Sequence, residues 1–332
     1  MIRLTINDKE IEVKEGTRII EACDQNGIEI PRFCYHEKFS IAGNCRMCLV
    51  QVEKMRGLCP SCVIECADGM VVHTDSDEVK KARQSVMEMM LINHPLDCPV
   101  CDQGGECDLQ DEAFAYGADR CRTQEKRRIV KDKELGPLIK TVMTRCIHCT
   151  RCIRFMDEVA GSPELGAIQR GEHVEITPFE EGPLISEMSG NLADVCPVGA
   201  LTNKAYAFRA RPWELSHTDS IDVMDATGSN IRIDTRGLEV MRILPRRHDG
   251  INEMWINDKT RYACDGLKMQ RLDQPYLRGE DGVLKPASWE DALSAVAKRL
   301  RNTLPDRVAA LVGDQVDCES IFAFKEFLDD LG

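Results

Sequence analysis

The sequence predicts an α+β protein made of several small domains, and three observations lead to that prediction. Strand-like alternation and helix-like spacing both occur, in short stretches that follow one another. Groups of cysteines interrupt the first two hundred residues or so. From about Arg211 the pattern becomes mainly strand-like, and near Pro286 it becomes helical. We therefore expect domains at 1–78, 79–120, 121–212, 213–272 and 273–332.

The composition excludes several functional classes. With 43% hydrophobic and 30% charged residues over 332 positions, the chain is typical of a globular protein with room for two or three domains. The net charge of −13 argues against a nucleic-acid partner. The sequence contains no apolar run of about 18 residues, so no membrane span is predicted. Its first residues lack a signal-peptide pattern. The sequence contains neither a G-x-G-x-x-G motif nor a P-loop, so no nucleotide site is predicted.

The first domain is expected to have a ubiquitin-like (β-grasp) arrangement. Residues 2–14 predict a hairpin with its turn at Asp8-Lys9, because β-branched residues alternate on both sides. A helix over 18–26 follows, and a strand over 49–53 comes after the first cysteines. A second hairpin, turning at Asp68-Gly69, completes the domain.

The second domain is expected to be a loop held between two helices. One of the residues 75–77 caps a helix that ends at Asn93, because Pro95 disfavours its continuation. A short helix over 108–115 follows the loop of residues 94–107.

In the rest of the chain the residue pattern changes twice. Residues 121–145 are charged and predict a linker, and a β-rich domain with turns at Gly228 and Gly237 follows. A helix over 288–302 and a buried strand over 308–313 then look like the opening of an α/β domain. That domain is too short to form its own core, so we expect a fragment or a split gene product.

The 17 cysteines favour metal binding over disulfides, because many occur as C-x2-C pairs in a chain without a secretory signal. The first set of candidate ligands consists of Cys34, Cys45, Cys48 and Cys62. Four thiolates suit a [2Fe-2S] cluster or zinc, and plant-type ferredoxins share the central pair with outlying cysteines. Cys59 and Cys66 remain alternatives for the fourth ligand.

The second set consists of His94, Cys98, Cys101 and Cys107. A histidine near a cysteine pair is, taken alone, more often a packed imidazole than a ligand. Here it directly follows a helix end, and Gly104-Gly105 let the backbone wrap tightly, which favours ligation of a [4Fe-4S] cluster. A neutral imidazole in place of a thiolate makes a cluster easier to reduce.

The third set consists of Cys146, Cys149, Cys152 and Cys196. This spacing, with Pro197 after the last cysteine, fits half of a two-cluster bacterial ferredoxin. The other half would need cysteines at positions that hold Met156, Ser186, Ser189 and Leu192. We therefore expect one [4Fe-4S] cluster here rather than two.

The alternative to clusters is structural zinc, because C-x2-C pairs also occur in zinc knuckles. A ferredoxin-like cysteine run argues against it. His36 and His148 are expected to lie beside the sites without binding metal. The remaining cysteines are expected to be small buried or chemically inert residues. They are Cys23, Cys59, Cys66, Cys121, Cys264 and Cys318.

With these motifs, the chain resembles the large iron-sulfur subunit of respiratory complex I, NADH:quinone oxidoreductase, and is most similar to its mitochondrial and related bacterial branch. The segments that carry the resemblance are 31–50, 91–111, 144–155, 194–204 and 210–237. Some bacterial members hold an additional cluster in the β-rich domain. We expect none here, because no cysteine lies between Cys196 and Cys264.

The resemblance implies one [2Fe-2S] cluster, two [4Fe-4S] clusters and a final molybdopterin-oxidoreductase-like domain without molybdenum cofactor. Electrons from a flavin- and NADH-binding subunit would reach the [2Fe-2S] site, then the Cys146 set, and then the His94 set on their way to quinone. The chain would be a subunit of a proton-translocating NADH dehydrogenase, with no NADH or quinone site of its own. Its partners would be the flavin subunit and other peripheral-arm subunits.

The implied location is the cytoplasmic face of a bacterial inner membrane, or the matrix side in mitochondria, with membrane contact only through the complex. Two alternatives remain open. The chain is also similar to the iron-sulfur arm of NAD-linked hydrogenases and formate dehydrogenases, although the extra hydrogenase cysteines and a molybdenum ligand are not visible. A zinc-stabilised interaction protein would be colourless.

Overall fold

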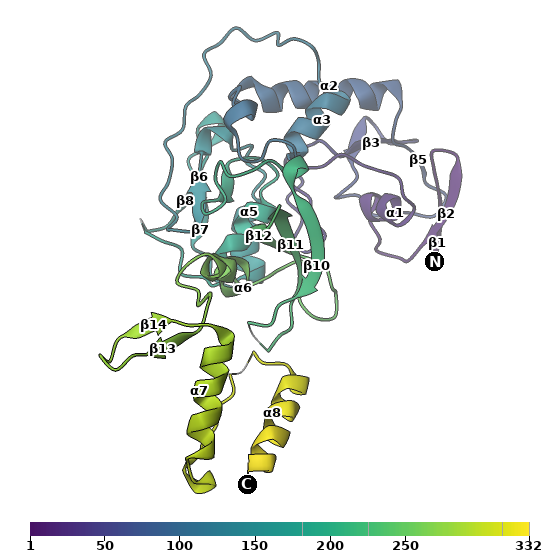
Figure 1. Cartoon of the computed structure of the whole chain (residues 1–332). Helices are drawn as coiled ribbons and strands as arrows, with labels where there is room; N and C mark the ends of the chain where they lie inside the picture. Colours follow the sequence, from purple (N-terminus) through teal and green to yellow (C-terminus); the bar gives the residue numbers. More distant parts are fainter. Residues whose placement is uncertain (181, 225, 314, 332) are drawn as a thin grey trace.

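The computed structural model describes every residue except 181, 225, 314 and 332. Its first domain is a mixed five-stranded sheet with one helix (Figure 1). The strand order is β2-β1-β5-β3-β4, with β1 antiparallel to β2 and parallel to β5. Alternate residues of β1 and β2 are buried against α1, as expected for a sheet with one covered face. The elements are β1 (Ile2–Ile6), β2 (Lys9–Val13), α1 (Ile19–Gln25), β3 (Leu49–Val52), β4 (Leu58–Pro60) and β5 (Val71–His73).

Two turn predictions in this domain are wrong. The first hairpin turns at Asn7 and Asp8, one residue early, because these residues adopt the positive φ angles of 47° and 66° that such a turn requires. The turn at Asp68 and Gly69 leads into β5, which pairs with β1 and β3 rather than with a strand before the turn. Hydrogen bonds from Gly69 N to Arg3 O and from Arg3 N to Asp68 Oδ1, at 2.8 and 3.0 Å, fix it beside β1. The second hairpin of this domain is β3-β4.

The second domain has the predicted pair of helices around a loop. Helix α2 (Asp77–Ile92) begins after Ser76, whose hydroxyl accepts a hydrogen bond from Val79 N at 3.4 Å. Helix α3 (Asp108–Tyr116) packs against α2. The Arg83 guanidinium of α2 donates to Leu49 O of β3 at 3.1 Å, so the helix pair is attached to the first domain.

The third domain consists of short elements that surround a large hydrophobic core. They are β6 (Ile139–Thr141), α4 (Arg151–Arg154), a π-helical turn (Phe155–Val159), β7 (Leu165–Ile168), β8 (Glu175–Pro178), α5 (Leu192–Val195) and β9 (Leu201–Asn203). Strand β6 pairs with β9, and β7 pairs with β8. The prediction of a solvated linker over 121–145 is correct only for its first part, because Val130 and Leu135 are buried in this core and β6 belongs to the same range.

The β-rich prediction agrees with a three-stranded antiparallel sheet of β10 (Ser216–Ile221), β11 (Asn230–Arg236) and β12 (Glu239–Pro245). Gly228 and Gly237 have φ angles of 65° and 60° at the turns before β11 and β12. Helix α6 (Asp258–Tyr262) follows, capped by the Asn257 side chain, which accepts from Thr260 N at 2.7 Å.

The C-terminal elements lie apart from the rest in Figure 1. They are β13 (Tyr276–Arg278), β14 (Leu284–Pro286), α7 (Trp289–Arg301) and α8 (Cys318–Leu331). The predicted buried strand over 308–313 is wrong, because this stretch is irregular and largely exposed. A buried strand needs a hydrogen-bonded neighbour, and no described segment pairs with it. No helix in the described ranges is long and apolar enough to cross a bilayer.

Single turns of 3₁₀ helix occur between these elements. They are Cys98–Val100, Met143–Arg145, Gly171–His173, Ser189–Asn191, Pro212–Glu214, Ala263–Leu267 and Pro305–Arg307.

Candidate iron-sulfur sites

Three cysteines of the first ligand set lie in the loop that joins α1 to β3, and their side chains meet that of Cys62, which follows β4. The Cys34 thiol hydrogen-bonds with those of Cys45 and Cys62, and Cys62 also hydrogen-bonds with Cys48. All are 5% exposed or less. Hydrogen bonds from Cys45 and Cys62 lower the pKa of Cys34, and one from Cys62 lowers the pKa of Cys48. A hydrogen bond donated to sulfur favours the thiolate, which is the form that binds metal.

The structure distinguishes Cys62 from its neighbours as the partner of this set. The Cys59 sulfur lies 3.8 Å from Met55 Sδ and from Gly57 O, within its own hairpin. Burial raises the pKa of the Cys66 thiol to about 11, followed by a smaller effect of Glu21. Cys62, by contrast, touches two other thiols of the set. Ligation by Cys62 remains a prediction, and this geometry favours it.

The third set converges at the start of α4. Cys146 follows the turn Met143–Arg145, Cys149 and Cys152 frame the first turn of α4, and Cys196 follows α5. The thiols influence one another electrostatically, so they occupy one pocket. Burial raises the pKa to about 11 for Cys146 and Cys196, to about 12 for Cys149, and well above the ordinary value for Cys152. Iron would have to displace these protons, as metals do at thiolate sites.

Backbone N–H groups point at the sulfurs of this set. His148 N donates to Cys146 Sγ at 3.4 Å, and its φ of 55° turns the loop around the sulfur. The N–H groups of Val198, Ala200 and Leu201 face Cys196. Such donors stabilise the negative charge of a bound cluster and set its potential. The His148 ring lies 3.0 Å from an Arg128 nitrogen, which fits its predicted place beside the site.

The second set is less closely gathered. Cys101 and Cys107 interact, Cys98 is exposed, and His94 lies at the end of α2. Burial lowers the pKa of His94 to about 4, with a smaller effect of the Arg145 charge. The imidazole is therefore neutral at pH 7, the form that binds metal. Its Nδ1 is buried and has no hydrogen-bond partner among the described residues. A ligated iron would supply the partner that such an atom requires.

The loops of the second and third sets touch. A Cβ on Gly199 would stand 2.1 Å from Cys101 Sγ, so only glycine fits at this contact. The Cys107 sulfur lies 3.7 Å from Pro197 O. Both Gly199 and Pro197 belong to the loop that carries Cys196. The two sets are therefore neighbours in space, although their loops are far apart in sequence.

Arg145 places a positive charge between these two sets. Its Nε and Nη2 donate to Asp97 Oδ2 at 3.0 and 2.9 Å, and its Nη1 donates to Gly199 O at 3.4 Å. The side chain is buried and immediately precedes Cys146. A cation here favours the reduced, more negative form of a nearby cluster. Neither Arg145 nor Gly199 was predicted from the sequence, and an arginine directly before a ligand was the available signal.

No group of three or more His, Cys, Asp or Glu side chains in the described parts of the chain could hold a single metal ion.

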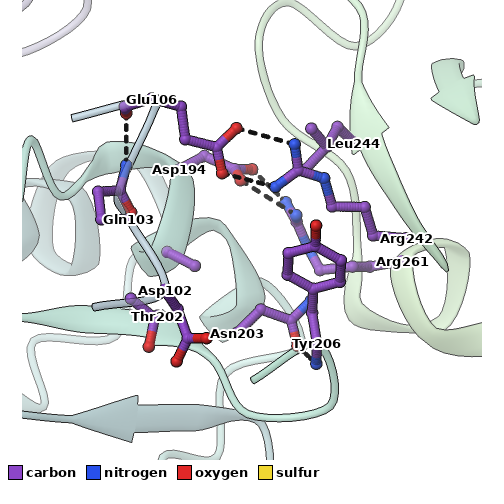
Figure 2. Close-up of a pocket in the computed structure, with 11 residues that line it drawn as sticks. Asp102, Gln103, Glu106, Asp194, Thr202, Asn203, Tyr206, Arg242, Leu244 and Arg261 are labelled. Atoms are coloured by element: carbon purple, nitrogen blue, oxygen red, sulfur yellow. Dashed lines mark hydrogen bonds and ion pairs between the residues drawn. The ribbon is translucent and has the colours of Figure 1, made fainter. Parts of the chain in front are cut away.

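A cavity of about 190 Å³ lies between the second loop, the third domain and the β-rich sheet (Figure 2). The Arg242 guanidinium in this cavity bonds Glu106 at 2.6 and 2.8 Å and Asp234 at 2.8 Å, and Arg261 pairs with Asp194. These ion pairs join three domains. The ion pairs around the cavity therefore hold these three domains together.

Family models match consecutive segments of the chain. Residues 1–77 match a "2Fe-2S iron-sulfur cluster binding domain" and residues 83–122 an "NADH-ubiquinone oxidoreductase-G iron-sulfur binding region". Residues 136–202 match the ferredoxin-like domain of "NADH-quinone oxidoreductase subunit 3". Residues 215–265 match an "NDSU1/NuoG-like, 4Fe-4S domain", and residues 271–332 match "Molybdopterin oxidoreductase". The prediction of a multidomain α+β chain is confirmed at this level.

Curated relatives match over the whole chain. The G subunit of the NADH-quinone oxidoreductase of Rickettsia bellii is 58% identical over 332 residues, which are 100% of this chain and 49% of the relative. The NADH-ubiquinone oxidoreductase 75 kDa subunit of Reclinomonas americana is 56% identical, with coverage of 100% and 48%. The chain spans about half the length of the curated relatives it matches.

A solved structure is also similar. It is the crystal structure of an NAD+-reducing [NiFe]-hydrogenase in the H2-reduced state, with a TM-score of 0.58 and 26% identity. The match covers 63% of this chain and 90% of the hydrogenase chain.

The ligand loops and these matches together define a chain of consecutive iron-sulfur domains of the oxidoreductase class. More narrowly, the chain belongs to the family of the large iron-sulfur subunit of NADH:quinone oxidoreductase, as its motifs predicted.

Proposed function

We propose that the chain transfers single electrons within an NADH:quinone oxidoreductase, between a flavin-containing NADH-binding subunit and quinone. One observation carries this proposal: cysteines of all three ligand sets border a single hydrophobic core. Its members include Cys34 and Cys45 of the first set, Cys107 of the second, and Cys149 and Cys196 of the third. Redox centres that share one core are close enough to relay charge, whereas separate structural metals have no need of such proximity.

The proposed cofactors are one [2Fe-2S] cluster at the first set and one [4Fe-4S] cluster at each of the other two. Clusters bound there would exchange one electron at a time. The chain's own residues bind them through thiolates and one imidazole, exclude water through the shared core, and adjust their potentials through N–H groups and arginines. The proposed order is first set, third set, second set.

The β-rich domain is proposed to carry no cluster. The residues that match the 4Fe-4S description, 215–265, contain Cys264 as their one cysteine, which is too few to hold a cluster. We propose that the domain serves as a support, attached to the cluster loops by Arg242 and Arg261. The segment after it is proposed to begin a molybdopterin-oxidoreductase-like domain without molybdenum.

The finer organisation is proposed in the same terms. The first domain, 1–78, has the sheet and helix of a β-grasp ferredoxin, and 79–120 forms the His/Cys helical unit. In this proposal residues 121–212 form a bacterial-ferredoxin-like unit, 213–272 a molybdopterin-oxidoreductase Fe-S-type unit without a cluster, and 273–332 the start of a molybdopterin-oxidoreductase-like domain. The proposed partners are the flavin subunit and other peripheral-arm subunits, on the cytoplasmic or matrix side of the membrane.

The iron content tests the proposal. The full chain, assembled anaerobically with iron and sulfide, should bind about ten irons. Its reduced form should show one [2Fe-2S] and two [4Fe-4S] signals by electron paramagnetic resonance (EPR). Four irons or fewer would overturn the proposal, and a colourless folded protein with zinc alone would favour the zinc alternative.

The similarity to a hydrogenase structure favours one further candidate, the iron-sulfur arm of an NAD-linked hydrogenase. Identity is 26% in that match but 58% in the match to the Rickettsia bellii relative. Co-purification with a nickel-containing partner would support the hydrogenase role. Reduction of quinone, and not of protons, by the assembled complex would support the NADH:quinone oxidoreductase role.

A further inference from the structure

The loop of the first ligand set packs directly on the helix that begins at the third set. Asn44 Nδ2 donates to His148 O at 3.1 Å. The Glu158 carboxylate, one turn beyond α4, accepts a hydrogen bond from Ser40 N at 2.7 Å and another from the Ser40 hydroxyl. Because Phe39 and Phe155 lie in the same core, the contact is apolar at its centre and hydrogen-bonded at its edge.

One arginine joins the backbones of two ligand residues across this contact. Arg154 Nη2 donates to Cys34 O at 2.5 Å and to Cys149 O at 3.2 Å. Its Nη1 donates to Ser40 O at 2.6 Å. Cys34 belongs to the first set and Cys149 to the third. A single guanidinium nitrogen therefore links the two sites through the ligand residues themselves.

The surroundings of Arg154 are those of a charge held between two negative centres. Its guanidinium lies over the Phe39 ring, 5.6 Å from the centroid, and its Nε is buried without a hydrogen-bond partner among the described residues. Arg151, one turn away, is 8% exposed; its Nη2 donates to Tyr35 O at 2.8 Å and its Nη1 lies 3.6 Å from Asp108 Oδ2. Arg154 is half-buried, and its hydrogen bonds among the described residues go to carbonyl oxygens. Partly burying a cation without a carboxylate partner is costly unless other negative charge lies close by. Thiolate-bound clusters on both sides would provide that charge.

We propose that Arg154 is a positioning residue that holds the [2Fe-2S] site of the first set against the [4Fe-4S] site of the third, and that its charge raises the reduction potentials of both. This inference rests on the proposed function. Lysine would reproduce the charge but not the positioning, because an ammonium is a point charge whereas the planar guanidinium directs several donors along fixed directions. Removal of the cation disfavours the reduced, more negative state of each cluster, so both midpoint potentials should fall.

The test compares the iron-loaded full chain with Arg154→Met and Arg154→Lys, and uses Arg122→Met as a matched control. Arg122 is largely exposed and pairs with Glu88, remote from both sites in sequence and in contacts. EPR redox titration gives the two midpoint potentials. The enhancement of [2Fe-2S] spin relaxation by the neighbouring reduced cluster reports their separation, and it does not depend on turnover.

We expect Arg154→Met to lower both potentials and to weaken the relaxation enhancement. Each lost hydrogen bond to a charged donor should increase the population with separated loops about tenfold. Arg154→Lys should keep both potentials near the wild-type values and still weaken the enhancement, whereas Arg122→Met should change neither. Unchanged potentials and relaxation in Arg154→Met, or a shift of one potential alone, would overturn the inference.

If Arg154→Met does not retain iron, the relaxation measurement on Arg154→Lys tests the inference instead. A weakened enhancement in that variant supports the inference, and a wild-type enhancement overturns it. The proposed function fails differently. A wild-type chain that lacks the [2Fe-2S] signal or binds four irons or fewer refutes that function whatever Arg154 does. A wild-type chain with all three signals and an unaffected Arg154→Met variant refutes only the role of Arg154.

Discussion

His94 is the one non-thiol among the candidate ligands, and its environment favours the neutral imidazole. Burial first, and then the Arg145 charge, lowers its pKa to about 4. His94→Cys would place a thiolate where the wild type has a neutral ligand. We expect the variant to keep its cluster with a midpoint potential lower by about 100 mV or more, in line with the difference between histidine-ligated and all-cysteine centres.

EPR redox titration of the loaded chain measures this shift. His217→Cys is a suitable control, because His217 is half-exposed and pairs with Asp234 in the β-rich sheet. A wild-type midpoint in His94→Cys, with the cluster retained, would argue that His94 is not a ligand.

Single residues also show how much the sequence predicts. The spacings of Cys34, Cys48 and Cys196 predicted which thiols would gather, because cluster ligands recur at characteristic separations. Arg145 and Arg154 were missed, because their roles depend on carbonyl oxygens that are remote in sequence, Gly199 O and Cys34 O. When a side chain's partner lies in another domain, the sequence around that side chain contains no pattern that indicates the partner.

At the scale of elements, the loop of residues 196–200 forms the contact between the second and third sets, and Gly199 allows the loop to approach Cys101 closely. Gly199→Ala would bring a methyl group 2.1 Å from Cys101 Sγ, so the two loops would have to separate. Overpacking of this kind costs about 1–3 kcal/mol. We expect the variant to lose the second [4Fe-4S] signal and about four irons while the [2Fe-2S] signal persists.

Iron analysis and EPR of the loaded chain test this prediction. Gly250→Ala is the matched control, because the nearest atom to its added Cβ is 3.6 Å away, an ordinary contact. Full iron content and a normal second signal in Gly199→Ala would contradict the close packing of these loops.

Elements with local signals were predicted well, and elements with distant partners were not. Helix α2 has its cap at Ser76 and its end before Pro95, and both signals lie in or beside the helix's own sequence. Strand β5 was assigned to the wrong partner, because its parallel neighbour β1 lies far earlier in the chain and nothing near Val71 indicates it. The stretch 308–313 has the apolar composition of a buried strand, but composition alone does not supply the neighbouring strand that it needs.

At the scale of the whole molecule, the proposed cluster ligands would act as long-range crosslinks. The first set spans Cys34 to Cys62, and the third spans Cys146 to Cys196, so bound iron would close two long loops of the unfolded chain. The ion pairs of Arg242 and Arg261 add contacts between domains that do not involve metal. Folding of residues 1–212 and iron binding should therefore be coupled, whereas α7 and α8 contain no ligand.

The buried thiols of the third set give this coupling a pH dependence. In the iron-free chain, burial raises the pKa of Cys146 and Cys196 from 9.0 to about 11 and that of Cys149 to about 12. The folded state thus keeps protons that the unfolded state loses first. The stability contributed by these thiols is fully present below about pH 9 and is lost as pH rises through about 11–12.

Iron reverses the direction of this dependence, because its ligands must be deprotonated thiolates and protons compete with it for sulfur. We expect iron removal to lower the unfolding midpoint already at pH 7, and to lower it by more between about pH 9 and 11, where the iron-free chain weakens further. The loaded chain should keep its stability over that range and lose it in acid instead. Anaerobic urea unfolding followed by circular dichroism at several pH values measures both curves. Identical pH profiles with and without iron would mean that the thiols of the third set do not bind it.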